Sequence, residues 1–319
     1  MDMILRTLVS VLLLAPLQLM AAEDCKPSEW GADDQMGAAN RITPASIKKA
    51  SRLIKTGKTY SLGITIDSDM PAFAPRTLSL TVVQPNQQEA NRPMGEMTYN
   101  DDIFTGWLGI GSQIDGLGHA GHKGIYYNCN DAKDFASVSG LTKLGIENVP
   151  PIVARGIVLD MAGHYGVSHL EAGQYFTVDD VKAVAKKQGT PIREGDVVLF
   201  HTGWTDAKLK SDPEAWVSGE PGQSEEVALY MASKKVVAVG ADTWGVDVVP
   251  PQVASRPYQG HVTYLKENGI YLFETMNTGP LVRDEAFEFL FVLGQSTLSS
   301  SENKAIGFMT TIQAYPSNC

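Results

Sequence analysis

The chain is short of positive charge. Lys and Arg number 26 among its 319 residues, against 36 Asp and Glu, which gives a formal net charge of −10 at pH 7. A protein that binds nucleic acid usually presents a basic patch, and no run of Lys and Arg occurs in this sequence. The composition therefore argues against a nucleic-acid partner and favours a soluble protein that binds a small molecule.

Several motifs of familiar enzyme chemistry are also absent. The sequence has no phosphate-binding loop, no Gly-x-Ser-x-Gly, no dinucleotide fingerprint after a strand and no Cys-x-x-Cys. Nucleotide chemistry and serine-hydrolase chemistry therefore have no support. Repeats and flexible linkers are lacking too, and 43% of the residues are hydrophobic. We expect a single packed domain over residues 23–319.

Long apolar runs are missing except near the N-terminus. Arg6 precedes an apolar run over residues 8–20, which ends in Ala21-Ala22 and is followed by Glu23-Asp24. This pattern is typical of a signal peptide, here residues 1–22, and the run is short for a membrane span. An N-terminal membrane anchor is the alternative. We expect an exported protein, periplasmic or secreted, with no membrane contact after cleavage.

Cysteine is scarce, with three residues in the whole chain. Cys25 and Cys319 lie at the two ends of the expected mature protein, and Cys129 lies between them. Exported proteins can keep disulfides. A Cys25–Cys319 bond joining the ends is one hypothesis, and three unpaired thiols are the other.

The hydrophobic pattern predicts an α/β fold with a mixed sheet and long loops. Strands succeed one another in the first half of the chain and alternate with helices in the second. Strands are expected over residues 60–66, 77–83, 152–160, 196–200, 236–241, 270–273 and 308–314. Helices are expected to begin after Thr43, Thr177 and Gly260, and over residues 224–234. Residues 84–97 and 206–223 are expected to be loops.

The most informative stretch is the glycine-rich segment of residues 109–119. Gln113 and Asp115 are two residues apart, so an extended backbone points both side chains to one face. His119 follows a glycine-rich bend that can return it to the same face. An amide oxygen, a carboxylate and an imidazole together suit a divalent ion such as Mn²⁺ or Zn²⁺. The alternative is a glycine-rich turn with a hydrogen-bonded Asp.

A second pair of metal-binding residue types lies further along the chain. His261 stands at the expected start of a helix, and Glu274 ends the strand that follows. A helix packed on its own strand can bring these two side chains together. A surface histidine and a solvated charge are the alternatives, but Glu274 lies among apolar residues, where an unpaired carboxylate is costly.

These residues resemble the cyclase family of metal-dependent hydrolases, which includes kynurenine formamidase and isatin hydrolase. The resemblance also covers Trp30-Gly31, Asp34-Gln35-Met36-Gly37, Asn40-Arg41, Thr43-Pro44, Gly57-Lys58, Tyr60-Ser61-Leu62 and Thr202-Gly203-Trp204. The family motif is His-x-Gly-Thr-His-x-Asp-x-Pro-x-His. Asp115 and His119 match its Asp and last His, whereas Gly109, Gln113 and Leu117 replace its first His, middle His and Pro. Full motifs in formamidase-like members go with two metal ions, so the two missing imidazoles weigh against a second ion.

The resemblance implies a swivelling β/β/α fold and a homodimer or larger homo-oligomer. It implies a divalent metal ion, Mn²⁺ or Zn²⁺, with Gln113, Asp115, His119, His261 and Glu274 as the candidate ligands, and leaves the number of ions open. The ion would activate a water molecule and polarise a substrate carbonyl. His119 is the expected general base, with His261 as the second catalytic candidate. The expected reaction is hydrolysis of a C–N bond in a small amide or lactam. The alternatives are a lactone hydrolase or cyclase, or a periplasmic ligand-binding protein without catalysis.

Overall fold

The expected strands assemble into one mixed sheet in the computed structural model. The structure describes residues 25–84, 98–295, 299–300, 303–304 and 309–316. The expected signal peptide of residues 1–22 therefore lies outside the described residues, as does nearly all of the loop expected over residues 84–97. None of the helices in the described ranges combines the length and apolarity that crossing a bilayer requires.

The helices and strands have the following bounds. The α-helices are α1 (Pro44–Ser51), α2 (Ala132–Phe135), α3 (Met161–Tyr165), α4 (Val178–Gln188), α5 (Trp204–Lys208), α6 (Pro213–Ser218), α7 (Glu225–Ser233), α8 (Gln259–His261) and α9 (Gly279–Arg283). Short 3-10 helices are η1 (Gly37–Arg41), η2 (Tyr127–Cys129) and η3 (Ile146–Asn148), and η4 (Val262–Glu267) is a π-helix. The strands are β1 (Tyr60–Ser61), β2 (Leu78–Val83), β3 (Asp101–Gly106), β4 (Gln113–Asp115), β5 (Ala136–Ser137), β6 (Gly140–Leu141), β7 (Ile152–Asp160), β8 (Tyr175–Phe176), β9 (Val197–His201), β10 (Gly222–Gln223), β11 (Ala238–Ala241), β12 (Tyr271–Glu274), β13 (Glu288–Gln295), β14 (Ser299–Ser300), β15 (Asn303–Lys304) and β16 (Met309–Pro316).

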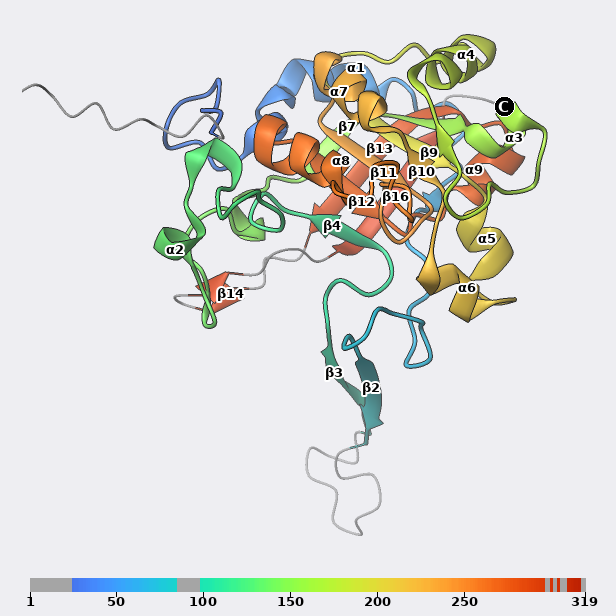
Figure 1. The fold of residues 1–319 in the computed structure, drawn as a ribbon. Helices are drawn as coiled ribbons and strands as arrows, with labels where there is room; N and C mark the ends of the chain where they lie inside the picture. Colours follow the sequence, from blue (N-terminus) through green and yellow to red (C-terminus); the bar gives the residue numbers. More distant parts are fainter. Residues whose placement is uncertain (1–24, 85–97, 296–298, 301–302, 305–308, 317–319) are drawn as a thin grey trace, which may run out of the picture.

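The main sheet has eight strands within the described residues, in the order β1-β16-β13-β7-β9-β11-β12-β4 (Figure 1). Strands β7, β9, β11 and β12 run parallel to one another, and the other neighbouring strands are antiparallel. Every side chain of β9, β11 and β12 is buried. Their sequences are almost continuously apolar, as expected for parallel strands covered on both faces. Helices α1 and α4 contact β7, and α7 contacts η4.

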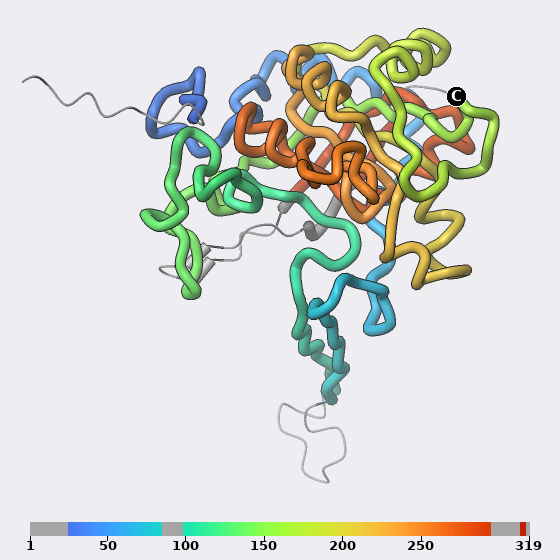
Figure 2. Tube along the Cα trace, viewed as in Figure 1, coloured from blue at the N-terminus to red at the C-terminus, as the bar shows by residue number. Residues whose placement is uncertain are grey.

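A two-stranded hairpin formed by β2 and β3 projects from this body. Its strands pair antiparallel from Leu78 opposite Gly106 to Val83 opposite Asp101. Figure 2 shows the hairpin extending away from the sheet and the helices. Every residue of β3 is exposed, and apolar side chains on both strands face solvent, among them Val82 at 59% and Ile103 at 53% exposure. The hairpin therefore adds surface to the protein but little to its core.

Most of the expected elements are present, and the local signals explain why. Strand β7 and helix α4 have the expected bounds, and Thr177 caps α4 through a reciprocal pair of hydrogen bonds with Asp180. The strand expected over residues 60–66 is shorter, because only Tyr60 and Ser61 pair with β16. The helix after Thr43 ends at Ser51, before the glycine expected to stop it.

The expectation of a surface loop over residues 206–223 was wrong. Helix α6 lies within it, with Asp212 accepting a hydrogen bond from the Ala215 amide and Pro213 at the first helical position. Trp216 is 2% exposed, and Glu220 is fully buried. The segment has a polar composition, which is why a surface loop was expected, but the buried indole of Trp216 anchors it to the interior.

The hypothesis of a Cys25–Cys319 disulfide and the alternative of three unpaired thiols were both wrong, because Cys25 is bonded to Cys129. The N-terminal segment lies against η2, where the Ser28 amide donates to Asn128 Oδ1 at 2.9 Å and the Tyr127 hydroxyl donates to Asp34 Oδ2 at 2.6 Å. These contacts bring the Cα atoms of the two cysteines to 5.2 Å. Cys319 lies outside the described residues.

Candidate metal centre

Two neighbouring strands bring the first three candidate residues together. Strand β4 pairs antiparallel with β12, which places Gln113 opposite Glu274. Gln113 Nε2 donates to Glu274 Oε2 at 2.7 Å and to Asp115 Oδ1 at 3.1 Å. All three side chains are buried. The two-residue spacing of Gln113 and Asp115 therefore places both on one face, as the sequence predicted.

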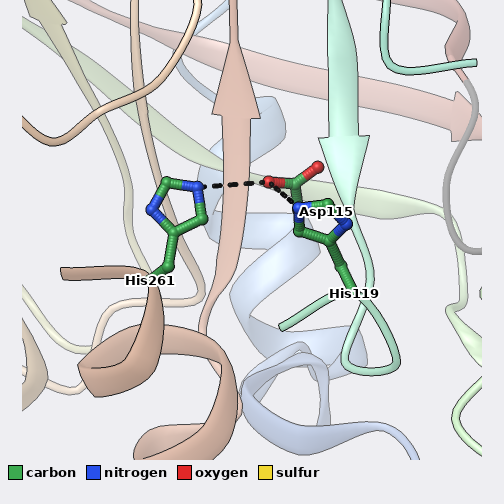
Figure 3. Close-up of side chains that lie close together, drawn as sticks. All are labelled: Asp115, His119 and His261. Carbon is green, nitrogen blue, oxygen red and sulfur yellow. Dashed lines mark ion pairs between the residues drawn. The ribbon is translucent and has the colours of Figure 1, made fainter. Parts of the chain in front are cut away.

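Two histidines approach the same carboxylate from different elements. His119 follows a turn in which its amide donates to the Gly116 carbonyl at 2.9 Å. Its Nε2 lies 3.6 Å from Asp115 Oδ2, and Nε2 of His261, in α8, lies 3.7 Å from the same oxygen. Figure 3 shows the Asp115 carboxylate between the two imidazoles. One donor atom from each residue lies within 4.8 Å of the others.

Asp247 fixes the orientation of His261. One of its oxygens accepts hydrogen bonds from the His261 amide at 3.1 Å and pairs with His261 Nδ1 at 2.7 Å, and the other accepts from the Gly260 amide at 3.1 Å. Nε2 is thereby directed toward Asp115 and toward Glu274 Oε1, which is 3.2 Å away. The sequence analysis did not include Asp247 among the site residues, because nothing in the local pattern indicates a contact across fourteen residues.

Acidic groups are concentrated at the centre. Burial raises the pKa of Glu274 to about 7, and the charge of Asp115 adds to this rise. Burial lowers the pKa of His261, but hydrogen bonds with Asp247 and Glu274 outweigh it and hold that pKa well above its ordinary value. Burial also raises the pKa of Glu220. A cation at this position would favour the ionised carboxylates.

The residues present fit a divalent ion. Asp115 Oδ2 is buried and has no hydrogen-bond partner among the described residues. A buried carboxylate oxygen without a partner is unfavourable, and a metal ion relieves that cost. The two imidazole nitrogens of His119 and His261 complete a donor set that suits Zn²⁺ or Mn²⁺.

Two other expected ligands lie at the centre but make different contacts. Gln113 directs its amide nitrogen at both carboxylates, so presenting its oxygen to an ion would require the opposite amide orientation. Glu274 shares its oxygens between Gln113 and His261. Both side chains therefore hold the ligands in place, and their own binding of an ion stays a prediction.

A cavity of about 700 Å³ opens onto the centre. The candidate residues Gln113, His119, His261 and Glu274 form part of its lining. Its other walls include Phe73, Arg76, His122, Trp244, Arg256 and Tyr258. Phe73 and Trp244 pack edge to face with ring centroids 4.2 Å apart. A cleft in which aromatic side chains stand beside polar and charged groups can bind a small molecule in a fixed orientation.

The remaining histidines serve other contacts. His164 lies 3.1 Å from Asp180, His169 lies 3.3 Å from Glu171, and His201 Nδ1 lies 2.8 Å from the Thr278 hydroxyl. None of these three lines the cavity.

Comparison with known proteins agrees with this architecture. No curated protein sequence matches the chain. A solved structure described as a novel cyclase has 28% sequence identity and a TM-score of 0.82, and the match covers 92% of this chain and 99% of that one. An isatin hydrolase bound to the product analogue thioisatinate has 15% identity and a TM-score of 0.58 over 81% of this chain and 92% of its own. Isatin hydrolase A from Ralstonia solanacearum has 18% identity and a TM-score of 0.58 over 81% and 91%.

The expected cyclase-like fold with a mixed sheet is thus confirmed. The family model named Cyclase matches residues 60–248, which include β4, Asp115 and His119 but end before His261. The chain belongs to the Cyclase family.

Proposed function

We propose that the protein is a metal-dependent hydrolase that cleaves the C–N bond of a small amide or lactam. The observation that carries this proposal is the convergence of Asp115, His119 and His261 beside a cavity of about 700 Å³. Membership of the Cyclase family and a fold shared with isatin hydrolases support it.

Asp115 and His261 would hold the ion, and His119 would lie beside it without binding it. A divalent ion bound there supplies Lewis acidity and makes hydroxide available near neutral pH. His261 is held by Asp247 with Nε2 toward the ion position, which is a common way to orient a metal-binding imidazole.

His119 is the partly exposed member of the group, with 32% of its side chain accessible. A histidine at a cavity wall can accept a proton from the attacking water and return it to the leaving nitrogen. Phe73 and Trp244 provide an apolar wall for the body of the substrate.

Turnover assays with added Mn²⁺ or Zn²⁺ test the function. The purified protein should hydrolyse one or more members of a panel that contains N-formylkynurenine, isatin and related cyclic amides and lactones. Chelation with EDTA should abolish turnover, and the ion should restore it. Binding of these compounds without any turnover would contradict the proposal and favour a ligand-binding protein. Turnover of lactones alone would assign the site to C–O bonds.

A further inference from the structure

Arg76 lines the cavity, and its hydrogen bond within the described residues goes to a backbone carbonyl, not to a carboxylate. Its Nη1 donates to the Gly109 carbonyl at 2.7 Å, and no carboxylate of the described residues lies within ion-pair distance of it. Arg256 lines the same cavity but is engaged by Glu225 at 2.8 Å. A guanidinium has five N–H donors in a planar fork, so most of the donors of Arg76 remain available to a ligand.

Gly109 has no side chain, and this leaves room for the guanidinium of Arg76 beside Gln113 at the metal centre. A Cβ at Gly109 would lie 3.0 Å from Arg76 Nη1 and 3.4 Å from Gln113 Oε1. Arg76 and Gln113 therefore flank the same point, and Gln113 in turn holds Asp115 and Glu274.

Aromatic side chains surround the same part of the cavity. Phe73 precedes Arg76 by three residues and packs against Trp244, and Tyr258 is a further lining residue. Their rings offer faces and edges to a planar ligand. The cavity thus joins an available guanidinium, aromatic walls and a metal centre.

We propose that Arg76 binds a carboxylate that the substrate already carries, so that the substrate class is aryl amides bearing a carboxylate next to the bond that is cleaved. This inference rests on the proposed function, because it assigns the substrate of the same site. A planar guanidinium binds a carboxylate through two parallel hydrogen bonds, and partial burial strengthens the pair. Arg76 is then a specificity-determining residue.

Binding to the metal-depleted protein tests Arg76 without any contribution from turnover. Isothermal titration calorimetry would compare 2-aminobenzoate with aniline, which lacks the carboxylate. The wild-type protein should bind 2-aminobenzoate more tightly, and Arg76→Ala should weaken that binding by about tenfold or more, as expected for a lost charged hydrogen bond. Binding of aniline should not change.

Two further variants separate Arg76 from the general charge of the cavity. Gly109→Ala keeps Arg76 and displaces its guanidinium by a few tenths of an ångström, so it should weaken binding of 2-aminobenzoate less than Arg76→Ala does. Arg256→Ala removes an equal charge from the same cavity and should change the affinity by less than about twofold. Equal losses in Arg76→Ala and Arg256→Ala, or no loss in Arg76→Ala, would overturn the proposal. Thermal melting would confirm that each variant is folded.

Kinetics with a matched pair of substrates extends the test. N-formylanthranilate yields formate and 2-aminobenzoate on hydrolysis, and formanilide is the same amide without the carboxylate. Arg76→Ala should raise KM for the first compound and leave the second unchanged. If Arg76 governs 2-aminobenzoate binding but the metal-loaded protein cleaves neither compound nor the wider panel, the proposed function fails and the carboxylate site stands. If both compounds are cleaved equally well by wild type and Arg76→Ala, the function stands and the role of Arg76 fails.

Discussion

Among the residues of the candidate metal centre, we expect Asp115 to matter most for binding the ion. It faces both imidazoles, and its Oδ2 has no hydrogen-bond partner within the described ranges. Asp115→Ala should therefore lose the bound ion, whereas His119→Ala should keep it and lose roughly 10²- to 10⁴-fold in rate if His119 is the general base. Metal content by mass spectrometry and kcat on the same preparations would check this. Loss of the ion from His119→Ala as well would make His119 a ligand.

Asp247 offers a second test at the scale of single residues. Its carboxylate holds His261 through both the backbone amide and Nδ1. Asp247→Asn should weaken metal affinity by about 10- to 100-fold, since the orientation of the imidazole depends on this contact. A competition titration with a chelator would measure it, with Asp206→Asn, a 48% exposed side chain, as the control. Unchanged affinity in Asp247→Asn would show that packing alone orients His261.

These residues also show what the sequence could and could not predict about the site. Gln113, Asp115 and His119 lie within seven positions, so strand alternation and a turn were sufficient to group them. His261 and Glu274 required a guess about how a helix packs on the next strand. Asp247 contacts His261, fourteen residues further along the chain, and Arg76 contacts Gly109, thirty-three residues further along. The fold creates both contacts. Nothing in the local pattern marks such contacts.

At the scale of elements, helix α4 combines a sequence signal with a measurable pH dependence. The Thr177 amide donates to Asp180 Oδ2 at 2.8 Å, and Tyr165 donates to the same carboxylate. Burial raises the pKa of Asp180, but hydrogen bonds from Thr177, Tyr165 and His164 outweigh it and lower the pKa to about 2. Because the folded value lies below the unfolded value of about 3.9, ionised Asp180 stabilises the fold above about pH 4. This contribution is lost as the pH falls toward about 2.

Asp180→Asn should consequently lower Tm at pH 7 by roughly 1–3 °C, and the difference from wild type should narrow below about pH 4. Circular dichroism melts between pH 3 and pH 7 would follow this difference. Asp179→Asn removes a neighbouring, 94% exposed charge from the same first turn and serves as the control. A difference that stays constant across this pH range would contradict the assignment to Asp180.

Elements with clear ends were predicted better than those without. Helix α4 has a capping box at one end and Gly189 at the other, and its bounds were predicted correctly. Strand β13 was not predicted, although it pairs with both β7 and β16 in the sheet. Its apolar run Phe289–Val292 shows no alternation, and such a run does not separate a buried strand from a buried helix. Strand β3 was missed because it is short and begins with two aspartates.

At the scale of the whole molecule, the projecting β2–β3 hairpin offers a candidate interface for the homo-oligomer that the family resemblance implies. Leu80 lies opposite Phe104, and Val82 follows on the same face, so exposed apolar side chains gather there. Exposed apolar patches often mark protein interfaces. We expect a homodimer or larger assembly in which this face is buried against a second copy.

Light scattering after size-exclusion chromatography would measure the assembly. The wild-type protein should have at least twice the mass of one chain, and the double variant Val82→Lys, Phe104→Asp should shift toward the monomer, because charges in a buried interface are unfavourable. Val138 is a fully exposed apolar residue outside the hairpin, so Val138→Lys is a matched control that should leave the mass unchanged. A wild-type protein that elutes as a monomer, or an equal shift in the control variant, would exclude the hairpin as the interface. Metal content measured on both variants would show whether the centre depends on the assembly or on one chain alone.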